Sequence, residues 1–136
     1  RNLMVRKYLE YPNSILIGTS SFWEGVDFPG DKVEILCIVK TPFDNPYDPI
    51  IKSQIEDYTQ KGKNAFLKYQ VPEATMKLRQ GFGRLIRNMN DVGICIIMDT
   101  RLYQRQYGKI ILCSLPVEAI PYQKVSKLIS DAQKFF

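Results

Sequence analysis

The sequence predicts an α/β fold, a parallel sheet flanked by helices. Short apolar runs without polar alternation recur along the chain, and this pattern is typical of parallel strands covered on both faces. Turn residues bound each run, and longer segments with helical spacing separate the runs. Strands that alternate with helices in this way favour parallel pairing, because each helix carries the chain back to the same end of the sheet. A chain of 136 residues is long enough to bury one core.

Each expected element has a local signal. The predicted strands are the apolar runs 15–17, 33–39, 92–98 and 110–113. The predicted helices cover 1–10, 50–62, 72–88, 101–107 and 123–136. The turn Tyr-Pro-Asn-Ser ends the first helix, Asp48-Pro49 supplies the N-cap and first turn of the second, and Pro72-Glu73 opens the third. Helical spacing predicts the inner faces of the second and last helices, Ile50, Ile51, Ile55 and Tyr58 in one and Val125, Leu128, Ile129 and Ala132 in the other.

The helix 72–88 presents basic residues along one side. At about 100° per residue, Gln80, Arg84 and Arg87 form a narrow stripe, and Lys77 extends it by one turn. Guanidinium groups one turn apart can neutralise charge on a transferring phosphoryl group, and an amide can orient a water or a neighbouring loop. The opposite side should face the sheet with Ala74, Leu78, Phe82 and Leu85.

Two glycines in the same helix call for a reason. Gly81 and Gly83 each weaken a helix by about 1 kcal/mol relative to alanine, and close approach of another backbone or a ligand is the usual explanation. From spacing alone, the alternative is an amphipathic helix with a solvated basic side.

The segment 18–30 leaves the first predicted strand with three hydroxyls, Thr19, Ser20 and Ser21, followed by Glu24, Gly25 and Asp27. Hydroxyls and backbone N–H groups of this kind commonly contact nucleic-acid phosphates, and Asp27 can accept a hydrogen bond from a ribose hydroxyl. A surface turn of small residues is the alternative. Ligands of parallel sheets bind beyond the carboxyl ends of the strands, where we expect this segment and the helix 72–88 to lie. No G-x-x-x-x-G-K-[ST] phosphate-binding loop is present in the chain.

Composition narrows the chemistry. The net charge of +5 suits a polyanionic partner, or serves solubility. The absence of histidine excludes a Ser-His-Asp triad, a Cys-His pair and histidine metal ligands. The three cysteines, Cys37, Cys95 and Cys113, lack metal-ligand spacing and are expected to be small buried hydrophobes in a reducing cytosol. No secretory signal and no apolar run near the ~20 residues of a membrane helix is present, so we expect a cytoplasmic protein.

Two of these segments resemble sequence motifs of one family. Residues 18–30, with the core F-W-E-G-V-D, resemble motif V of DinG/XPD-type superfamily 2 DNA helicases. Residues 80–87 resemble motif VI, Q-x-x-G-R-x-x-R. Further similarity lies at Pro42-Phe43, Asp48-Pro49, 69–74 and Asp99-Thr100-Arg101, and the resemblance covers about 14–116. Both motifs stand in the expected order.

The resemblance implies that residues 1–136 form a RecA-like C-terminal motor domain of a longer 5′–3′ helicase on single-stranded DNA. It implies that Arg87 is an arginine finger with Arg84 as its partner, and that Gln80 couples the nucleotide to the domain interface. It further implies ribose or motif VI contacts for Asp27, and a shaping role for Glu24 and Gly25. Thr19 and Ser20 would contact the DNA backbone. ATP with Mg²⁺ would be held mostly by the first RecA-like domain of the same polypeptide.

Several family features lie outside this sequence. Walker A, a D-E-A-H-type box and the motif IV strand are absent from it, and an iron–sulfur cluster would belong to the first motor domain. We therefore expect a fragment that is inactive alone. The alternatives are a non-motor nucleic-acid-binding or regulatory domain that gates a fused exonuclease, and a degenerate scaffold domain, against which the Arg84 and Arg87 pair argues.

Overall fold

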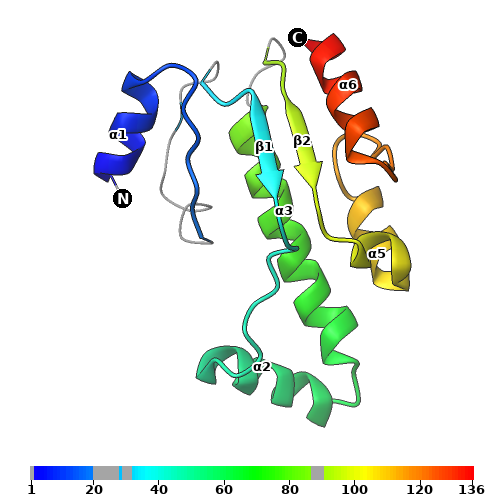
Figure 1. The fold of residues 1–136 in the computed structure, drawn as a ribbon. Helices are drawn as coiled ribbons and strands as arrows, with labels where there is room; N and C mark the ends of the chain where they lie inside the picture. Colours follow the sequence, from blue (N-terminus) through cyan, green and yellow to red (C-terminus); the bar gives the residue numbers. More distant parts are fainter. Residues whose placement is uncertain (1, 20–27, 29–31, 87–90) are drawn as a thin grey trace. The chain divides into compact units, whose positions relative to one another are not determined.

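A computed structural model describes residues 2–19, 28, 32–86 and 91–136, in two compact units that comprise residues 1–99 and 100–136 (Figure 1). Unit 1 contains α1 (Asn2–Glu10), β1 (Ile35–Ile38), α2 (Pro49–Gln60), the π-helix η2 (Phe66–Gln70), α3 (Val71–Leu85) and β2 (Ile94–Ile97). Unit 2 contains α4 (Arg101–Gln104), α5 (Gln106–Cys113) and α6 (Val125–Phe135).

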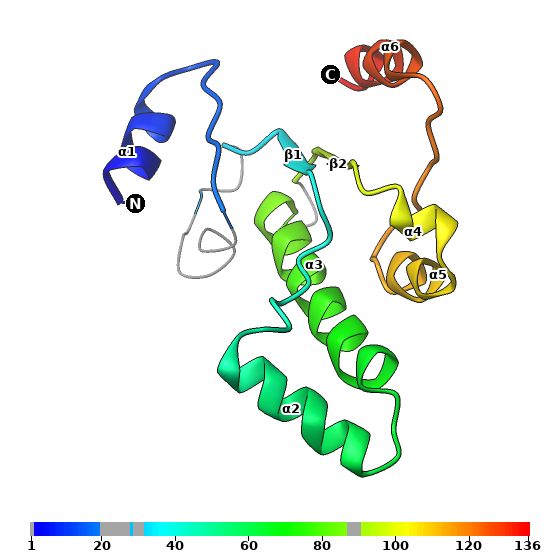
Figure 2. The same ribbon diagram turned by 60° about the horizontal axis from the view of Figure 1, so that its bottom comes forward.

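The sheet of unit 1 is parallel, as predicted. β1 pairs with β2 in the register Ile35↔Ile94 to Ile38↔Ile97. Backbone hydrogen bonds continue the ladder at both ends, from Ile94 N to the Glu34 oxygen and from Met98 N to the Ile38 oxygen. The connection between the two strands runs through α2, η2 and α3, and α2 and α3 form two arms of it (Figure 2). The predictions of strands within 33–39 and 92–98 are confirmed.

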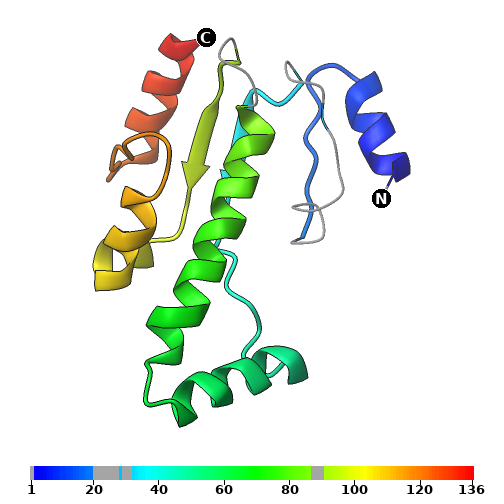
Figure 3. The same cartoon turned by 180° about the vertical axis from the view of Figure 1, so that it is seen from behind.

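α3 supplies most of the core of unit 1. It runs along both strands (Figure 3). The four side chains predicted to face the sheet are all buried, at 8% exposure or less: Ala74, Leu78, Phe82 and Leu85. Burial of such side chains is the main stabilising term for a helix on a sheet. The 3.6-residue period therefore placed the inner side of this helix correctly.

The expectation of strands covered on both faces is wrong for the described part of unit 1. Ile38 is buried, but Ile35 and Val39 are 49% and 62% exposed. Alternate side chains of a strand point to opposite faces, and α3 covers only one of them. A run of apolar residues indicates apolar side chains on both faces but does not show what packs on each face.

Two predicted strands do not form in the described part of the chain. Residues 15–17 belong to no helix and no ladder, and Ile15 and Ile17 are 88% and 83% exposed. A strand requires a hydrogen-bonded neighbour, and β1 pairs only with β2 there. Residues 110–113 belong to α5, because Gly108 and Ile111 form its buried side at helical spacing. Four apolar residues alone could not distinguish the two structures.

The helix boundaries follow their capping signals. Asp48 caps α2 by accepting from the backbone N–H groups of Ile50 and Ile51, at 2.9 and 3.4 Å. After α2, Gly62 takes a positive φ of 66°, the conformation that closes many helices. α3 ends at Leu85, not at Asn88, because Ile86 is extended. Among the described residues, no helix is both long and apolar enough to span a membrane.

Candidate functional site

The polar side of α3 carries two of the three predicted catalytic residues. Gln80 is exposed and Arg84 is half-buried, whereas the residues opposite them form the core. Arg84 lies in the last turn, where a positive charge suits the helix dipole. Arg87 falls outside the described residues. The pairing of two guanidinium groups therefore remains a prediction, while the helical spacing of Gln80 and Arg84 is confirmed.

Lys77, which was predicted to extend the basic stripe, is paired with an acidic residue. Its ammonium forms an ion pair and hydrogen bond with the Asp44 carboxylate, and both side chains are half-buried. Asp44 lies 33 residues earlier, in the loop after β1. A contact at that separation leaves no periodic signal in the sequence. Lys77 therefore links α3 to this loop, and its charge is already compensated.

The arginine end of α3 lies at the amino ends of the strands. α3 runs antiparallel to β1 and β2 (Figure 1). A Cβ atom on Gly93, just before β2, would come within 2.8 Å of the Leu85 Cγ atom. The expectation that the whole helix approaches the carboxyl ends is therefore wrong for Arg84. A crossover helix must deliver the chain to the start of the next strand, so its last turn lies there.

Asp99, which belongs to one of the short stretches of family resemblance, links the carboxyl ends of the two strands. Asp99 accepts hydrogen bonds from the Thr41 backbone N–H at 2.9 Å and from the Thr41 hydroxyl at 2.7 Å. Both residues are buried, at 4% and 8% exposure for Thr41 and Asp99. A buried carboxylate with two donors is satisfied rather than strained. An aspartate directly after an apolar run was the available signal.

The loop from Thr41 to Asp48 is held along its length. Thr41 is fixed by Asp99, Phe43 stacks on Phe66 with ring centroids 5.6 Å apart, and Asp48 caps α2. Next to the Asp44–Lys77 pair, the Tyr69 ring stacks on the Tyr58 ring, with centroids 5.7 Å apart. Desolvation raises the pKa of Tyr69, and the Glu73 and Asp44 carboxylates raise it further. This end of α3 is therefore a packed junction that contains the Asp44–Lys77 ion pair.

Of the predicted segment 18–30, the structure describes only residues 18, 19 and 28. Thr19 is exposed. Ser20, Glu24, Gly25 and Asp27 lie outside the described residues. Phe28 is buried, and its ring meets the ring of Tyr8 from α1 edge to face. Tyr8 had no motif or spacing signal in the sequence.

Gly83 has open space around it. Apart from its chain neighbours and the backbone of its own helix, no described atom lies within 4 Å of a Cβ atom placed on Gly83. The close approach predicted for Gly83 therefore finds no neighbour within the described part of the chain. Gly81, in contrast, is buried on the sheet side of α3.

Comparisons with known proteins point to one family. Residues 1–118 match the helicase C-terminal domain. The chain is 45% identical over 113 residues to the ATP-dependent DNA helicase YoaA of Haemophilus influenzae, and 45% identical over 112 residues to the ATP-dependent DNA helicase DinG of Photobacterium profundum. It is 43% identical over 115 residues to the 3′-5′ exonuclease DinG of Bacillus subtilis. These alignments cover 82% to 85% of this chain but only 12% to 18% of the relatives.

Proposed function

This chain belongs to the helicase C-terminal domain family, and from that premise we propose that it acts as the second motor domain of an ATP-dependent DNA helicase. The observation that carries the proposal is the presence of F-W-E-G-V-D and Q-x-x-G-R-x-x-R, in order, in a DinG-type chain. A first RecA-like domain of the same polypeptide would supply the phosphate-binding loop and most contacts to Mg²⁺, because this sequence has no such loop.

In this proposal α3 serves the nucleotide. Arg87 and Arg84 meet the charge that develops on the γ-phosphate, and Gln80 couples the nucleotide to the domain interface. The described geometry supports these roles in one respect: α3 is fixed by its buried side and carries Gln80 and Arg84 on the other. A guanidinium remains charged at any working pH and offers several donors to phosphate oxygens. Asp27 contacts the ribose, and Glu24 with Gly25 shapes the segment around it.

Thr19 and Ser20 contact the backbone of single-stranded DNA in this proposal. The net charge of +5 supports a polyanionic partner, since cationic side chains release the counterions condensed on nucleic acid. ATP binding closes the cleft between the two motor domains, and hydrolysis reopens it. Each cycle advances the protein in the 5′ to 3′ direction.

Substitution of the arginines tests the role of α3. In the full-length helicase, Arg87→Ala is expected to lower DNA-stimulated ATP turnover by roughly 10³-fold, as loss of an arginine finger does in related phosphoryl transfer. Arg84→Ala is also expected to lower DNA-stimulated ATP turnover. Binding of single-stranded DNA, measured by fluorescence anisotropy, should be largely unchanged. Arg79 is an exposed arginine on the same helix, and Arg79→Ala is the matched control. Near-normal turnover in Arg87→Ala would remove this residue from the role.

A second function is favoured by one comparison. The Bacillus subtilis relative, which is 43% identical to this chain over 115 residues, is named a 3′-5′ exonuclease. The domain could then be a regulatory module in which ATP gates a fused nuclease without unwinding. A strand-displacement assay on the full-length protein separates the two. ATP-dependent unwinding supports the motor, and nucleotide-controlled degradation without unwinding supports the gate.

A further inference from the structure

Tyr8 connects α1 to the residues at the end of segment 18–30. Its hydroxyl donates a hydrogen bond to the Lys32 carbonyl oxygen at 2.7 Å. Its ring meets the Phe28 ring edge to face, with centroids 5.7 Å apart and an interplanar angle of 83°. Its own carbonyl oxygen accepts from the Ser14 hydroxyl at 2.9 Å. Tyr8 therefore contacts three residues that lie apart in the sequence, Ser14, Phe28 and Lys32.

Phe28 is the more buried partner in this contact. It is 8% exposed, whereas α1 has no buried residue. Tyr8 itself is half-buried. Burial raises the pKa of the Tyr8 phenol, and the Glu34 carboxylate raises it further. The phenol therefore keeps its proton near neutral pH and remains a donor to Lys32.

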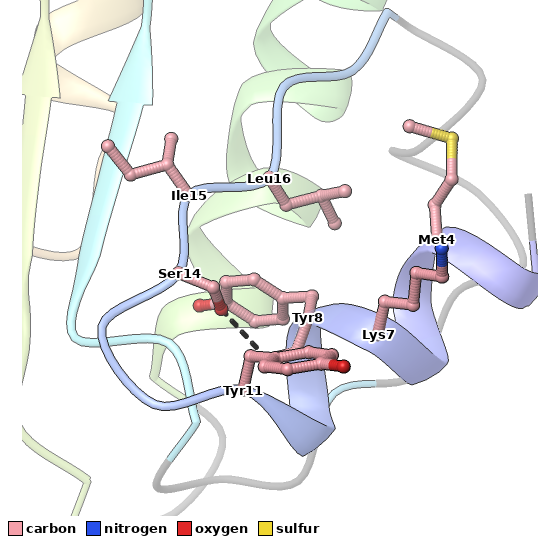
Figure 4. Close-up of a pocket in the computed structure, with 7 residues that line it drawn as sticks. All are labelled: Met4, Lys7, Tyr8, Tyr11, Ser14, Ile15 and Leu16. Carbon is pink, nitrogen blue, oxygen red and sulfur yellow. Dashed lines mark hydrogen bonds between the residues drawn. The ribbon is translucent and has the colours of Figure 1, made fainter.

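A neighbouring tyrosine provides a comparison. A partly open cavity of about 300 Å³ lies between α1 and the stretch that follows it, and Tyr8 and Tyr11 both line it (Figure 4). Tyr11 is 64% exposed. Within the described residues, the Tyr11 side chain has none of the hydrogen bonds or ring contacts that Tyr8 makes. Both tyrosines line the cavity, but only Tyr8 contacts Phe28 and Lys32 among the described residues.

We propose that Tyr8 is a positioning residue that holds Phe28 and Lys32, two residues that follow Asp27 in the sequence. This inference rests on the proposed function, in which Asp27 contacts the ribose of ATP. Phe28 is the next residue after Asp27, and consecutive Cα atoms are only ~3.8 Å apart. A ring that holds Phe28 therefore acts on the residue that follows Asp27 in the sequence. In this proposal Tyr8 does not contact the nucleotide itself and acts through the sequence neighbour of a residue that does.

Steady-state kinetics test this role. In the full-length helicase with saturating single-stranded DNA, Tyr8→Ala is expected to raise the KM for ATP roughly tenfold and to change kcat by less than about twofold. Loss of binding energy that is common to the ground state and the transition state changes KM alone. A merely structural role would reduce the folded fraction and hence kcat, at unchanged KM. Thermal unfolding of each variant reports the folded fraction.

Further variants make the test more specific. Tyr8→Phe keeps the ring contact and is expected to raise KM less than Tyr8→Ala, and Tyr11→Ala is expected to match the wild type. Phe28→Ala should raise KM as Tyr8→Ala does, and the double variant should be no worse than either, because both remove one contact. A wild-type KM in Tyr8→Ala, or additive effects of the two alanines, overturns the proposal. If Tyr8→Ala does not fold, Tyr8→Leu decides by the same criterion.

Asp27→Asn separates this inference from the proposed function. If Asp27→Asn raises KM and Tyr8→Ala does not, only the positioning role fails. If Tyr8→Ala raises KM and Asp27→Asn does not, Tyr8 positions the segment but the ribose role of Asp27 is wrong. If neither variant changes KM, both ideas fail.

Discussion

Cys37 and Cys95 stand on neighbouring strands with their side chains on opposite faces of the sheet. Cys95 pairs with Leu36 in the register and therefore shares a face with it, while Cys37 pairs with Ile96 on the other face. Cys37 and Cys113 are exposed and Cys95 is half-buried. The expectation of three buried cysteines is thus wrong for two of them. Residue type alone predicted burial, but the register and the covering helix decided which thiol is shielded.

Thiol labelling checks this assignment. Burial raises the pKa of Cys95 to about 12, with a further contribution from Cys37. Because the thiolate is the reactive form, iodoacetamide at pH 8 should label Cys37 and Cys113 before Cys95, as followed by mass spectrometry. The raised pKa also means that Cys95 favours folding below the unfolded-state pKa of 9.0, an advantage lost as the pH rises toward 12. Cys95→Ala should remove that part of the alkaline destabilisation. Equally fast labelling of all three would contradict the shielding.

At the scale of elements, two helical glycines differ in how closely neighbouring atoms pack against them. A Cβ atom on Gly108 would collide with the backbone of Leu102, so α4 and α5 meet at that point. Gly83, on α3, has no described neighbour within 4 Å. The same residue type is therefore a packing requirement in one helix and an unexplained weakness in the other.

A pair of alanine substitutions tests that contrast. Urea unfolding of the chain, followed by circular dichroism, should show Gly108→Ala destabilised by about 1–3 kcal/mol or more, because backbone must move. Gly83→Ala should be more stable by up to ~1 kcal/mol, since alanine is the better helix former. In the proposed full-length helicase, a loss of ATPase activity in the stabilised Gly83→Ala variant would reveal the close approach that the sequence predicts. Equal destabilisation in both variants would contradict the geometry.

For the whole molecule, the chain represents a small part of the relatives it matches. It covers 12% of the Bacillus subtilis relative and 18% of the Haemophilus influenzae relative. The sequence contains a candidate arginine finger and no phosphate-binding loop. Its proposed chemistry therefore needs a second domain.

The chain by itself should not hydrolyse ATP. Phosphate release from the purified 136-residue chain, with and without single-stranded DNA, should not exceed the background. The physical reason is that arginines stabilise charge in the transition state but do not by themselves hold Mg²⁺ or the β-phosphate. The proposed full-length helicase at equal concentration is the positive control. Robust hydrolysis by the chain alone would mean that it contains a nucleotide site of another kind.

The sequence alone determined the parallel α/β character, the positions of β1 and β2, the inner side of α3 and the family, because periodicity and contiguous motifs are local properties. Only the tertiary structure decided that Lys77 pairs with Asp44, that Asp99 holds Thr41, that Tyr8 reaches Phe28, and that the Arg84 end of α3 lies at the amino ends of the strands. It also decided that residues 15–17 form no strand and that 110–113 are helical. These outcomes depend on contacts between distant residues, and neither composition nor spacing records which distant partner a side chain will meet.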